Sequence, residues 1–114
     1  MITIYHNPRC SKSRQTLELL KTQGISPEIE LYLDHPPSAD TLSDILKKLG
    51  LEANQLIRKS EAYYKENLKG LELSEDQLIE AMTQNPKLIE RPIVVAGDKA
   101  AIGRPPEAVL EIIQ

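Results

Sequence analysis

Cys10 is the one cysteine among 114 residues, and it stands where a strand-forming segment passes into a helix-forming one. Residues 1–5 are rich in β-branched side chains, and the strand pattern stops at His6 and Asn7-Pro8. A thiol at the start of a helix lies beside free backbone N–H groups and the positive end of the helix dipole, which lower its pKa. The position therefore suits a nucleophilic thiolate, and it also suits a bound oxyanion.

Cations cluster around Cys10 in the sequence. The six residues from Arg9 to Arg14 hold three cations, counting Lys12, and no acid. First turns of helices usually carry Asp or Glu, because cations are disfavoured beside the positive end of the dipole. Local rules of this kind fail mainly at functional sites, so the cluster predicts a bound anion. The alternative is a buried, inert cysteine with Lys12 and Arg14 in water, but the position at a strand end favours the reactive thiol.

Ser13 stands three residues after Cys10, where a dithiol oxidoreductase carries its second cysteine. Any disulfide that Cys10 forms must therefore be with another molecule, which excludes a self-contained dithiol cycle. A single cysteine also excludes a disulfide-stapled secreted scaffold and fits the reducing cytosol, so we expect a cytoplasmic protein. With two histidines, one cysteine and no paired spacing, no metal site is expected.

Three further arginines stand in positions that suit oxyanion binding. Arg91 directly precedes Pro92 at the start of a strand, Arg104 lies in a Gly-Arg-Pro-Pro turn, and Arg58 lies in a short helical segment. The planar donor fork of arginine matches tetrahedral oxyanions. Taken singly, each is more often a solvated surface charge, and the pattern alone does not bring the three together. His6, four residues before the cysteine, either tunes the thiol or has a structural role.

The elements that must position these residues follow the order strand–helix–strand, a helical block, and then strand–strand–helix. The first unit implies a parallel strand pair, and the whole predicts an α/β domain with helices packed on a small mixed four-stranded sheet. The predicted strands are 1–5, 29–33, 92–96 and 99–102, and the predicted helices are 11–24, 38–49, 54–59, 60–64, 74–84 and one that opens at Pro105 or Pro106.

Composition limits the class of protein. Apolar residues make up 40% of the chain and charged residues 27%, which is typical of one globular domain with its own core. With four Tyr, no Phe and no Trp, that core must consist of Leu, Ile, Val and Ala. A net charge of −3 makes a nucleic-acid partner unexpected, and no apolar run is long enough for a membrane span. We expect a monomer.

Four stretches in order along the chain resemble the glutaredoxin-coupled arsenate reductase family, in particular its small chromosomal branch. They are residues 5–14, 56–58, 90–95 and 103–107. The likeness covers the whole chain at the family's spacing, which makes it more specific than any one motif. It implies a thioredoxin-like fold in a single domain over 1–114, with a helical insertion at roughly 38–88.

The resemblance also implies an activity and a site. The protein would reduce arsenate to arsenite through a thiolate–arsenic intermediate, with no bound cofactor and with glutathione and glutaredoxin as external reductants. Cys10 would be the nucleophile, and Arg58, Arg91 and Arg104 would surround the oxyanion. Pro92 would be a cis-proline that faces the active-site loop. The residues that would bind the oxyanion or tune the thiolate are His6, Ser11, Lys12, Ser13 and Arg14.

The chain departs from the best-known members of that family beside the cysteine. Arg9 replaces a small residue, Ser11 and Lys12 replace a Gly-Thr pair, and Gln15 stands where Asn is common. These changes either favour oxyanions, alter the preferred substrate or orient a different thiol partner. The alternative function is a non-enzymatic redox adapter, like the transcription regulators that share this fold. Those sensors carry a second cysteine three residues on, and Ser13 counts against such a switch.

Overall fold

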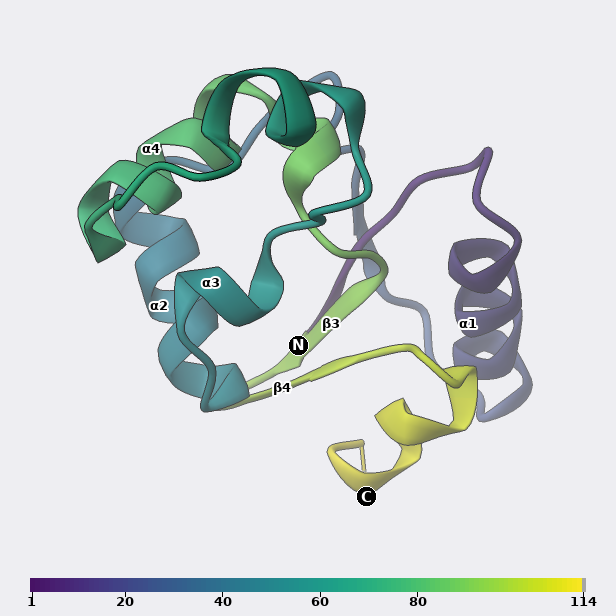
Figure 1. The fold of residues 1–114 in the computed structure, drawn as a ribbon. Coiled ribbons are helices and arrows are strands. Elements are labelled where there is room, and N and C mark those ends of the chain that lie inside the picture. Colours follow the sequence, from purple (N-terminus) through teal and green to yellow (C-terminus); the bar gives the residue numbers. More distant parts are fainter. Residues whose placement is uncertain (114) are drawn as a thin grey trace. The chain divides into compact units, whose positions relative to one another are not determined.

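Two compact units make up the computed structural model of the protein, which describes residues 1–113 (Figure 1). The sheet unit consists of residues 1–35 and the C-terminal residues from Arg91 onward, and the helical unit consists of Pro36–Glu90. The helical unit covers the segment in which a helical insertion is predicted, whereas the single-domain organisation stays a prediction. None of the helices within residues 1–113 has the length and apolar character of a membrane span.

The sheet unit is built on four strands in the order β2-β1-β3-β4. β1 pairs in parallel with β2 and antiparallel with β3, and β3 pairs antiparallel with β4. A parallel strand–helix–strand unit therefore lies beside a β-hairpin, which confirms the predicted mixed α/β class and its thioredoxin-like fold. The bounds are Ile2–Tyr5 for β1, Glu28–Glu30 for β2, Ile93–Ala96 for β3 and Lys99–Ile102 for β4.

The second strand is shorter than the sequence predicts, and the expected extent of 29–33 is wrong at its C-terminal end. Its partner β1 ends at Tyr5, which is paired with Glu30. The last bond of the ladder runs from the His6 N–H to the Glu30 carbonyl at 2.8 Å, after which two N–H groups donate to the Leu31 carbonyl. The alternation of apolar residues continues past the point where β1 offers a partner, so the pattern overstates the strand.

Helix α1 (Ser11–Thr22) and the C-terminal helix η3 (Pro106–Glu111) contact each other and complete the sheet unit (Figure 1). Its core joins β1, α1, β3 and η3 through four fully buried aliphatic side chains. Each such side chain contributes about 1.5–3 kcal/mol when it is removed from water. The four residues are Ile4, Leu20, Val94 and Val109. Helix η3 thus anchors the turn that carries Arg104 to the rest of the unit.

The last helix differs in type from the α-helix that the sequence predicts, because η3 is a 3₁₀ helix. Its bonds span three residues, as from the Ala108 N–H to the Pro105 carbonyl at 2.9 Å. Pro106 occupies its first turn, where a missing N–H costs no helical bond. The element is only six residues long, and 3₁₀ geometry is typical of such short pieces at the end of a chain segment.

Three α-helices form the framework of the helical unit, with α4 in contact with both others. The helical spacing of the apolar residues in α2 and α4 predicts one buried face on each of these two helices. The structure buries those faces, with Leu42 and Ile45 in α2 and Leu78 and Met82 in α4, and it also buries Leu56 in α3. The bounds are Ala39–Leu49 for α2, Ala53–Leu56 for α3 and Glu75–Gln84 for α4.

Side chains cap the N-termini of α2 and α4. The Ser38 hydroxyl accepts a hydrogen bond from the Thr41 N–H at 3.1 Å, and Gly50 ends α2 in the left-handed conformation with φ 71°. At α4, Ser74 and Gln77 form a capping box in which each side chain accepts the other's backbone N–H, at 3.2 and 2.8 Å. Such caps contribute about 1 kcal/mol each, so they fix where these helices begin.

The predicted helix over 54–59 ends early, because its C-terminal half pairs with another segment of the helical unit. Ile57 forms an isolated antiparallel β-bridge with Ile89. The Arg58 N–H then donates to the Leu88 carbonyl at 2.7 Å. These partners lie some thirty residues away in the chain, so local helical propensity does not reveal them. The extended backbone that results is what positions Arg58.

The predicted helix over 60–64 has the wrong bounds and type, because the chain is helical only from residue 62 and continues as a π-helical turn, η1 (Tyr64–Leu68). A bond from the Lys69 N–H to the Tyr64 carbonyl at 2.8 Å closes that turn. No side chain of η1 is buried, so no apolar face selects regular α geometry. The 3₁₀ helix η2 (Pro86–Leu88) follows α4, which ends before the Asn-Pro step as predicted.

Gly103 lies where β4 leaves the sheet, and its site has no room for a side chain. Its N–H donates to the Pro92 carbonyl at 2.9 Å. A Cβ at this position would lie 2.8 Å from Pro92 Cγ and would overlap Thr16 Oγ1. Thr16 is fully buried in α1, and its hydroxyl donates to the Lys12 carbonyl at 2.8 Å, so it cannot easily move. Close packing of Thr16 against Gly103 therefore holds α1 beside the end of β4.

We expect Gly103→Ala to lower the free energy of unfolding by about 1–3 kcal/mol, since the added methyl group must displace packed neighbours. The measurement is urea denaturation followed by circular dichroism. The matched variant combines Gly103→Ala with Thr16→Ala, which removes the closest clash. Its loss of unfolding free energy should be smaller than the sum of the losses in the two single variants. Strictly additive losses would show that the contact with Thr16 does not matter.

Candidate active site

Cys10 is the N-cap residue of α1, and a tight turn places it there. The Cys10 N–H donates to the Asn7 carbonyl at 3.0 Å, and the Asn7 side-chain oxygen accepts the Arg9 N–H at 3.0 Å. Pro8 occupies the second position of this turn, which its fixed φ suits. On the helical side, the Cys10 carbonyl accepts the Arg14 N–H at 3.0 Å. The thiol is therefore held between a turn and a helix, and only 9% of its residue surface is exposed.

Several groups act on the pKa of Cys10. Burial acts to raise it, because a thiolate is less stable away from water. Hydrogen bonds from the backbone N–H groups of Ser13 and Lys12 act in the opposite direction, as do the positive charges of Arg91 and Arg104. The lowering contributions prevail, and the pKa of the thiol lies below its ordinary value. A larger share of the resting protein than of free cysteine therefore carries the nucleophilic thiolate.

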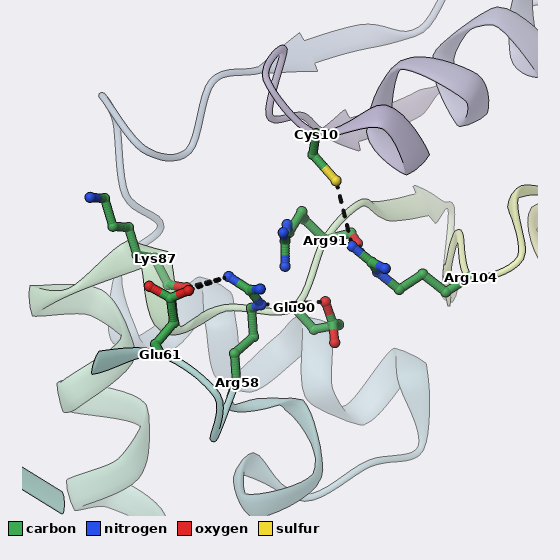
Figure 2. Close-up of polar contacts among 7 residues, drawn as sticks. All are labelled: Cys10, Arg58, Glu61, Lys87, Glu90, Arg91 and Arg104. Atoms are coloured by element: carbon green, nitrogen blue, oxygen red, sulfur yellow. Dashed lines mark hydrogen bonds and ion pairs between the residues drawn. The ribbon is translucent and has the colours of Figure 1, made fainter. Parts of the chain in front are cut away.

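Arg104 connects the thiol to the cis-proline turn, as Figure 2 shows. Its Nε donates to the Arg91 carbonyl at 2.8 Å, and its Nη2 donates to Cys10 Sγ at 3.5 Å. The Arg91–Pro92 peptide bond is cis, as the resemblance implies, and the Arg104–Pro105 bond is also cis, which nothing in the sequence predicted. Arg104 is thus anchored by one nitrogen and directed at the sulfur by another.

His6 is neutral and structural in its contacts. Burial, followed by the charges of Arg14 and Lys21, lowers the pKa of the imidazole. Its Nδ1 lies 2.6 Å from the Ser13 hydroxyl, which also accepts the Asn7 N–H at 2.9 Å. The Ser13 hydroxyl thus joins the imidazole to the backbone of the turn, with the direction of the His6–Ser13 hydrogen bond set by the tautomer of His6. His6 therefore shapes the turn rather than adding positive charge beside the thiolate.

Ser13→Ala should lower the free energy of unfolding by about 1–3 kcal/mol, because it leaves His6 Nδ1 and the Asn7 N–H without their buried partner. Urea denaturation measures the loss. Ser11→Ala is the control, because Ser11 directly follows Cys10 and is exposed. This substitution should change the free energy of unfolding by less than about 0.5 kcal/mol. Equal effects of the two substitutions would contradict the buried network.

Among the cations nearest to the thiol in sequence, Arg14 is engaged in another contact. Arg14 Nη1 donates to the Pro8 carbonyl at 2.8 Å and so braces the turn. Arg9 and Ser11 are exposed, and Lys12 is half-buried. The contribution of Lys12 to the thiol pKa comes from its backbone N–H. The sequence cluster of Arg9, Lys12 and Arg14 is therefore not the main source of positive charge at the sulfur.

Arg58 belongs to the helical unit, where two carboxylates hold it (Figure 2). Its Nη1 donates to Glu61 Oε2 at 2.8 Å and lies 3.4 Å from the Lys87 carbonyl, and its Nε is 3.8 Å from Glu90 Oε1. The side chain is largely shielded, so these contacts fix its direction. Its part at the oxyanion stays a prediction from the resemblance.

Sequence reasoning missed two residues that build the site. Asn7 forms the turn with its carbonyl and side-chain oxygen, and Gly103 allows α1 to approach the end of β4. The Asn-Pro dipeptide was a readable signal for the first, because both residues favour turns. The signal for Gly103 was weaker, since a glycine after a strand usually marks a turn rather than a close contact. Among residues 1–113, no group of three or more His, Cys, Asp or Glu side chains could hold a metal ion.

Comparison with known proteins places the chain in a family. The model of the ArsC family matches residues 5–112, nearly the whole chain. This chain belongs to the ArsC family. As an ArsC-family protein, it carries its buried N-cap thiol and its cis-proline turn within the matched range.

Individual proteins are similar to this chain over nearly their full lengths. An uncharacterised protein of Escherichia coli K12 is 61% identical, over 98% of this chain and 96% of its own. An arsenate reductase of Haemophilus influenzae is 54% identical over 98% of both chains. The solved structure of an arsenate reductase from Vibrio cholerae superposes with a TM-score of 0.95 at 53% identity, covering 98% of this chain and 97% of that one.

Proposed function

We propose that this protein reduces arsenate to arsenite, with Cys10 as the nucleophile. The observation that carries the proposal is the contact between Arg104 and the sulfur at the N-terminus of α1. It brings a thiol of lowered pKa into contact with a guanidinium. The names of the Haemophilus and Vibrio relatives support arsenate as the oxyanion.

In the first step, the Cys10 thiolate attacks the As(V) centre of arsenate. An S–As bond forms, and one arsenate oxygen leaves as water after it takes protons from the solvent. The guanidinium groups of Arg91 and Arg104 and the N–H groups of the first helical turn neutralise the remaining oxygens. Arg58 is the third arginine that the resemblance implies for the oxyanion.

Reduction requires two external thiols, because Ser13 occupies the place of a second cysteine. One thiol forms a second S–As bond and releases another water. A second thiol then attacks the sulfur of the first, that S–As bond breaks, and its electron pair stays on arsenic, which becomes As(III). The external sulfurs leave as a disulfide. Water finally cleaves the bond between arsenic and Cys10, releasing arsenite and restoring the thiolate.

Glutathione and glutaredoxin are the thiols that we propose for these two attacks, with no cofactor bound to the chain. Glutathione is the small peptide thiol that enters the S–As adduct, and glutaredoxin attacks its sulfur. Both are components of reducing compartments, and a free catalytic thiol such as Cys10 requires the same conditions. The cytoplasm is therefore the proposed location, and a monomer suffices for this chemistry.

The test is arsenite production by the purified protein with arsenate, glutathione, glutaredoxin, glutathione reductase and NADPH. Arsenite is separated and quantified by mass spectrometry, and one NADPH should be consumed for each arsenite. Mixtures that lack glutaredoxin, glutathione or the protein serve as controls. Arsenite formation no faster than in the protein-free mixture would overturn the proposal. Full turnover without glutaredoxin would overturn only its part in the cycle.

A further inference from the structure

The buried polar side chains of residues 1–113 all come from the segment around Cys10. They are His6, Ser13 and Thr16. The first two bond to each other, and Ser13 also accepts the Asn7 N–H, so both support the turn before the thiol. Thr16 makes separate contacts. Burial of a hydroxyl is unfavourable unless the group is hydrogen-bonded, so its partners indicate why a threonine stands here in place of an aliphatic residue.

The Thr16 hydroxyl is held against one peptide group of the first helical turn. Its Oγ1 donates to the Lys12 carbonyl at 2.8 Å and lies 3.5 Å from the Gly103 carbonyl. Because a hydroxyl has one proton, the shorter distance assigns that proton to Lys12. Close packing against Gly103, where even a Cβ would overlap the hydroxyl, restricts rotation of the Thr16 side chain. The bond to Lys12 is therefore a fixed feature of α1.

The same peptide group contacts the sulfur with its other end. The carbonyl of Lys12 and the N–H of Ser13 belong to one planar peptide unit, and this N–H donates to the Cys10 thiolate. Burial raises the pKa of Cys10, and the Ser13 N–H is the largest of the contributions that lower it. A peptide that accepts a hydrogen bond at its carbonyl becomes a stronger donor at its N–H, since linked hydrogen bonds polarise one another.

We propose that Thr16 is a positioning residue for the Cys10 nucleophile, because its hydroxyl orients and polarises the peptide whose N–H stabilises the thiolate. The inference rests on the proposed function, which makes Cys10 the nucleophile, and adds to it a residue further along α1. The charged groups that act on the same sulfur, Arg91 and Arg104, belong to the cis-proline turn and to the segment after β4. Thr16 acts without charge and through the helix itself.

Titration of the thiol tests the proposal without arsenate. Cys10 is the only cysteine, so alkylation by iodoacetamide reports on this sulfur alone, and its rate follows the share of thiolate as the pH changes. Thr16→Val removes the hydroxyl, so the rise in rate should move to higher pH. At a pH below that rise, the share of thiolate should fall about twofold to fivefold. Thr16→Ser keeps the hydroxyl and should titrate as wild type does.

Two further variants control for bulk and for the loss of any helical hydroxyl. Thr16→Ala also removes the hydroxyl but adds no bulk beside Gly103, so it should shift the titration in the same direction as Thr16→Val. Thr22→Val is the matched control, because the Thr22 hydroxyl donates to the Leu19 carbonyl at 2.8 Å near the other end of α1. Its titration should match wild type. A shift in only one of the two hydroxyl-free variants, in neither, or of equal size in Thr16→Ser would overturn the proposal.

A second measurement observes the peptide itself. In the ¹⁵N-labelled protein, the Ser13 amide proton resonance should move as Cys10 ionises, because a thiolate accepts a stronger hydrogen bond than a thiol. That movement should be smaller in Thr16→Val. The Lys12 N–H also donates to the thiolate, but it belongs to the preceding peptide, so its movement should stay the same. Equal changes at both amides, or no change at Ser13, would overturn the proposal.

The Arg104→Lys background separates the two routes to the sulfur. If Thr16 acts through the peptide, Thr16→Val should cause its shift in that background too. Loss of the shift would mean that Thr16 acts by placing Arg104, and would overturn the proposal.

These measurements also separate the inference from the proposed function. The expected shifts without any arsenite formation would refute arsenate reduction and leave the role of Thr16 standing, because neither readout involves arsenate. Arsenite formation with an unshifted titration in the hydroxyl-free variants would refute the role of Thr16 and leave the function standing.

Discussion

Cys10→Ser should abolish arsenite formation, with kcat falling at least about 10⁴-fold to the level of the protein-free mixture. Serine has nearly the same size, but its hydroxyl is protonated at neutral pH, and Arg91 and Arg104 cannot lower its pKa far enough to make an alkoxide. No S–As bond forms, so there is no adduct for an external thiol to reduce. Every step of the proposed cycle passes through this one atom.

The measurement on Cys10→Ser has two parts. The coupled assay compares the rate of arsenite production by the variant with that of wild type. Mass spectrometry after incubation with arsenite then shows whether arsenic stays bound to the chain. Circular dichroism and thermal unfolding should show an intact fold, because the substitution keeps the shape of a residue that makes no side-chain cap. Wild-type turnover by the variant would refute Cys10 as the nucleophile, whereas the same background rate in both proteins would refute the enzymatic function and favour the redox adapter.

Arg104→Lys should lower kcat/KM for arsenate by about 10²–10³-fold while the fold remains intact. Lysine keeps the charge but cannot bridge the Arg91 carbonyl at 2.8 Å and Cys10 Sγ at 3.5 Å with two separate nitrogens. The loss therefore falls on both the thiolate and the oxyanion that forms beside it. Because Arg104 helps to lower the pKa of Cys10, its replacement should also raise that pKa.

Alkylation of the thiol by iodoacetamide measures that shift directly. The thiolate reacts and the thiol does not, so the rate rises with pH and levels off above the pKa. In wild type the rise should occur below the pH at which free cysteine titrates, since the folded protein lowers the pKa. In Arg104→Lys the same rise should move to higher pH.

Lys99→Gln provides the control for the alkylation experiment. Lys99 is an exposed cation on β4, the strand that leads to Arg104, and it lies outside the thiol site. Its loss changes the net charge of the protein without removing a contact to Cys10. The pH profile should therefore match wild type. Identical profiles and equal kcat/KM values in wild type and Arg104→Lys would contradict the role assigned to Arg104.

Local features of the fold could be predicted because their partners lie close in the chain. The Ser38 cap and the Ser74–Gln77 capping box each join residues three apart, and the structure has both. The parallel pairing of β1 with β2 could also be predicted, because a strand–helix–strand order is compatible with few chain topologies. Prediction failed where distant partners compete, as at Ile57, which leaves α3 to pair with Ile89.

Residue types and their spacing predict the chemistry of the site. The sequence places a lone thiol at a helix N-terminus, denies it a second cysteine and supplies arginines beside prolines. The tertiary structure alone selected the cations that act on the sulfur. The nearby Arg14 braces the Pro8 carbonyl, whereas Arg104, 94 residues away from Cys10, reaches the thiol. Residue patterns encode the local backbone, but the approach of distant segments depends on packing, here on a glycine at 103 that lets α1 and the end of β4 meet.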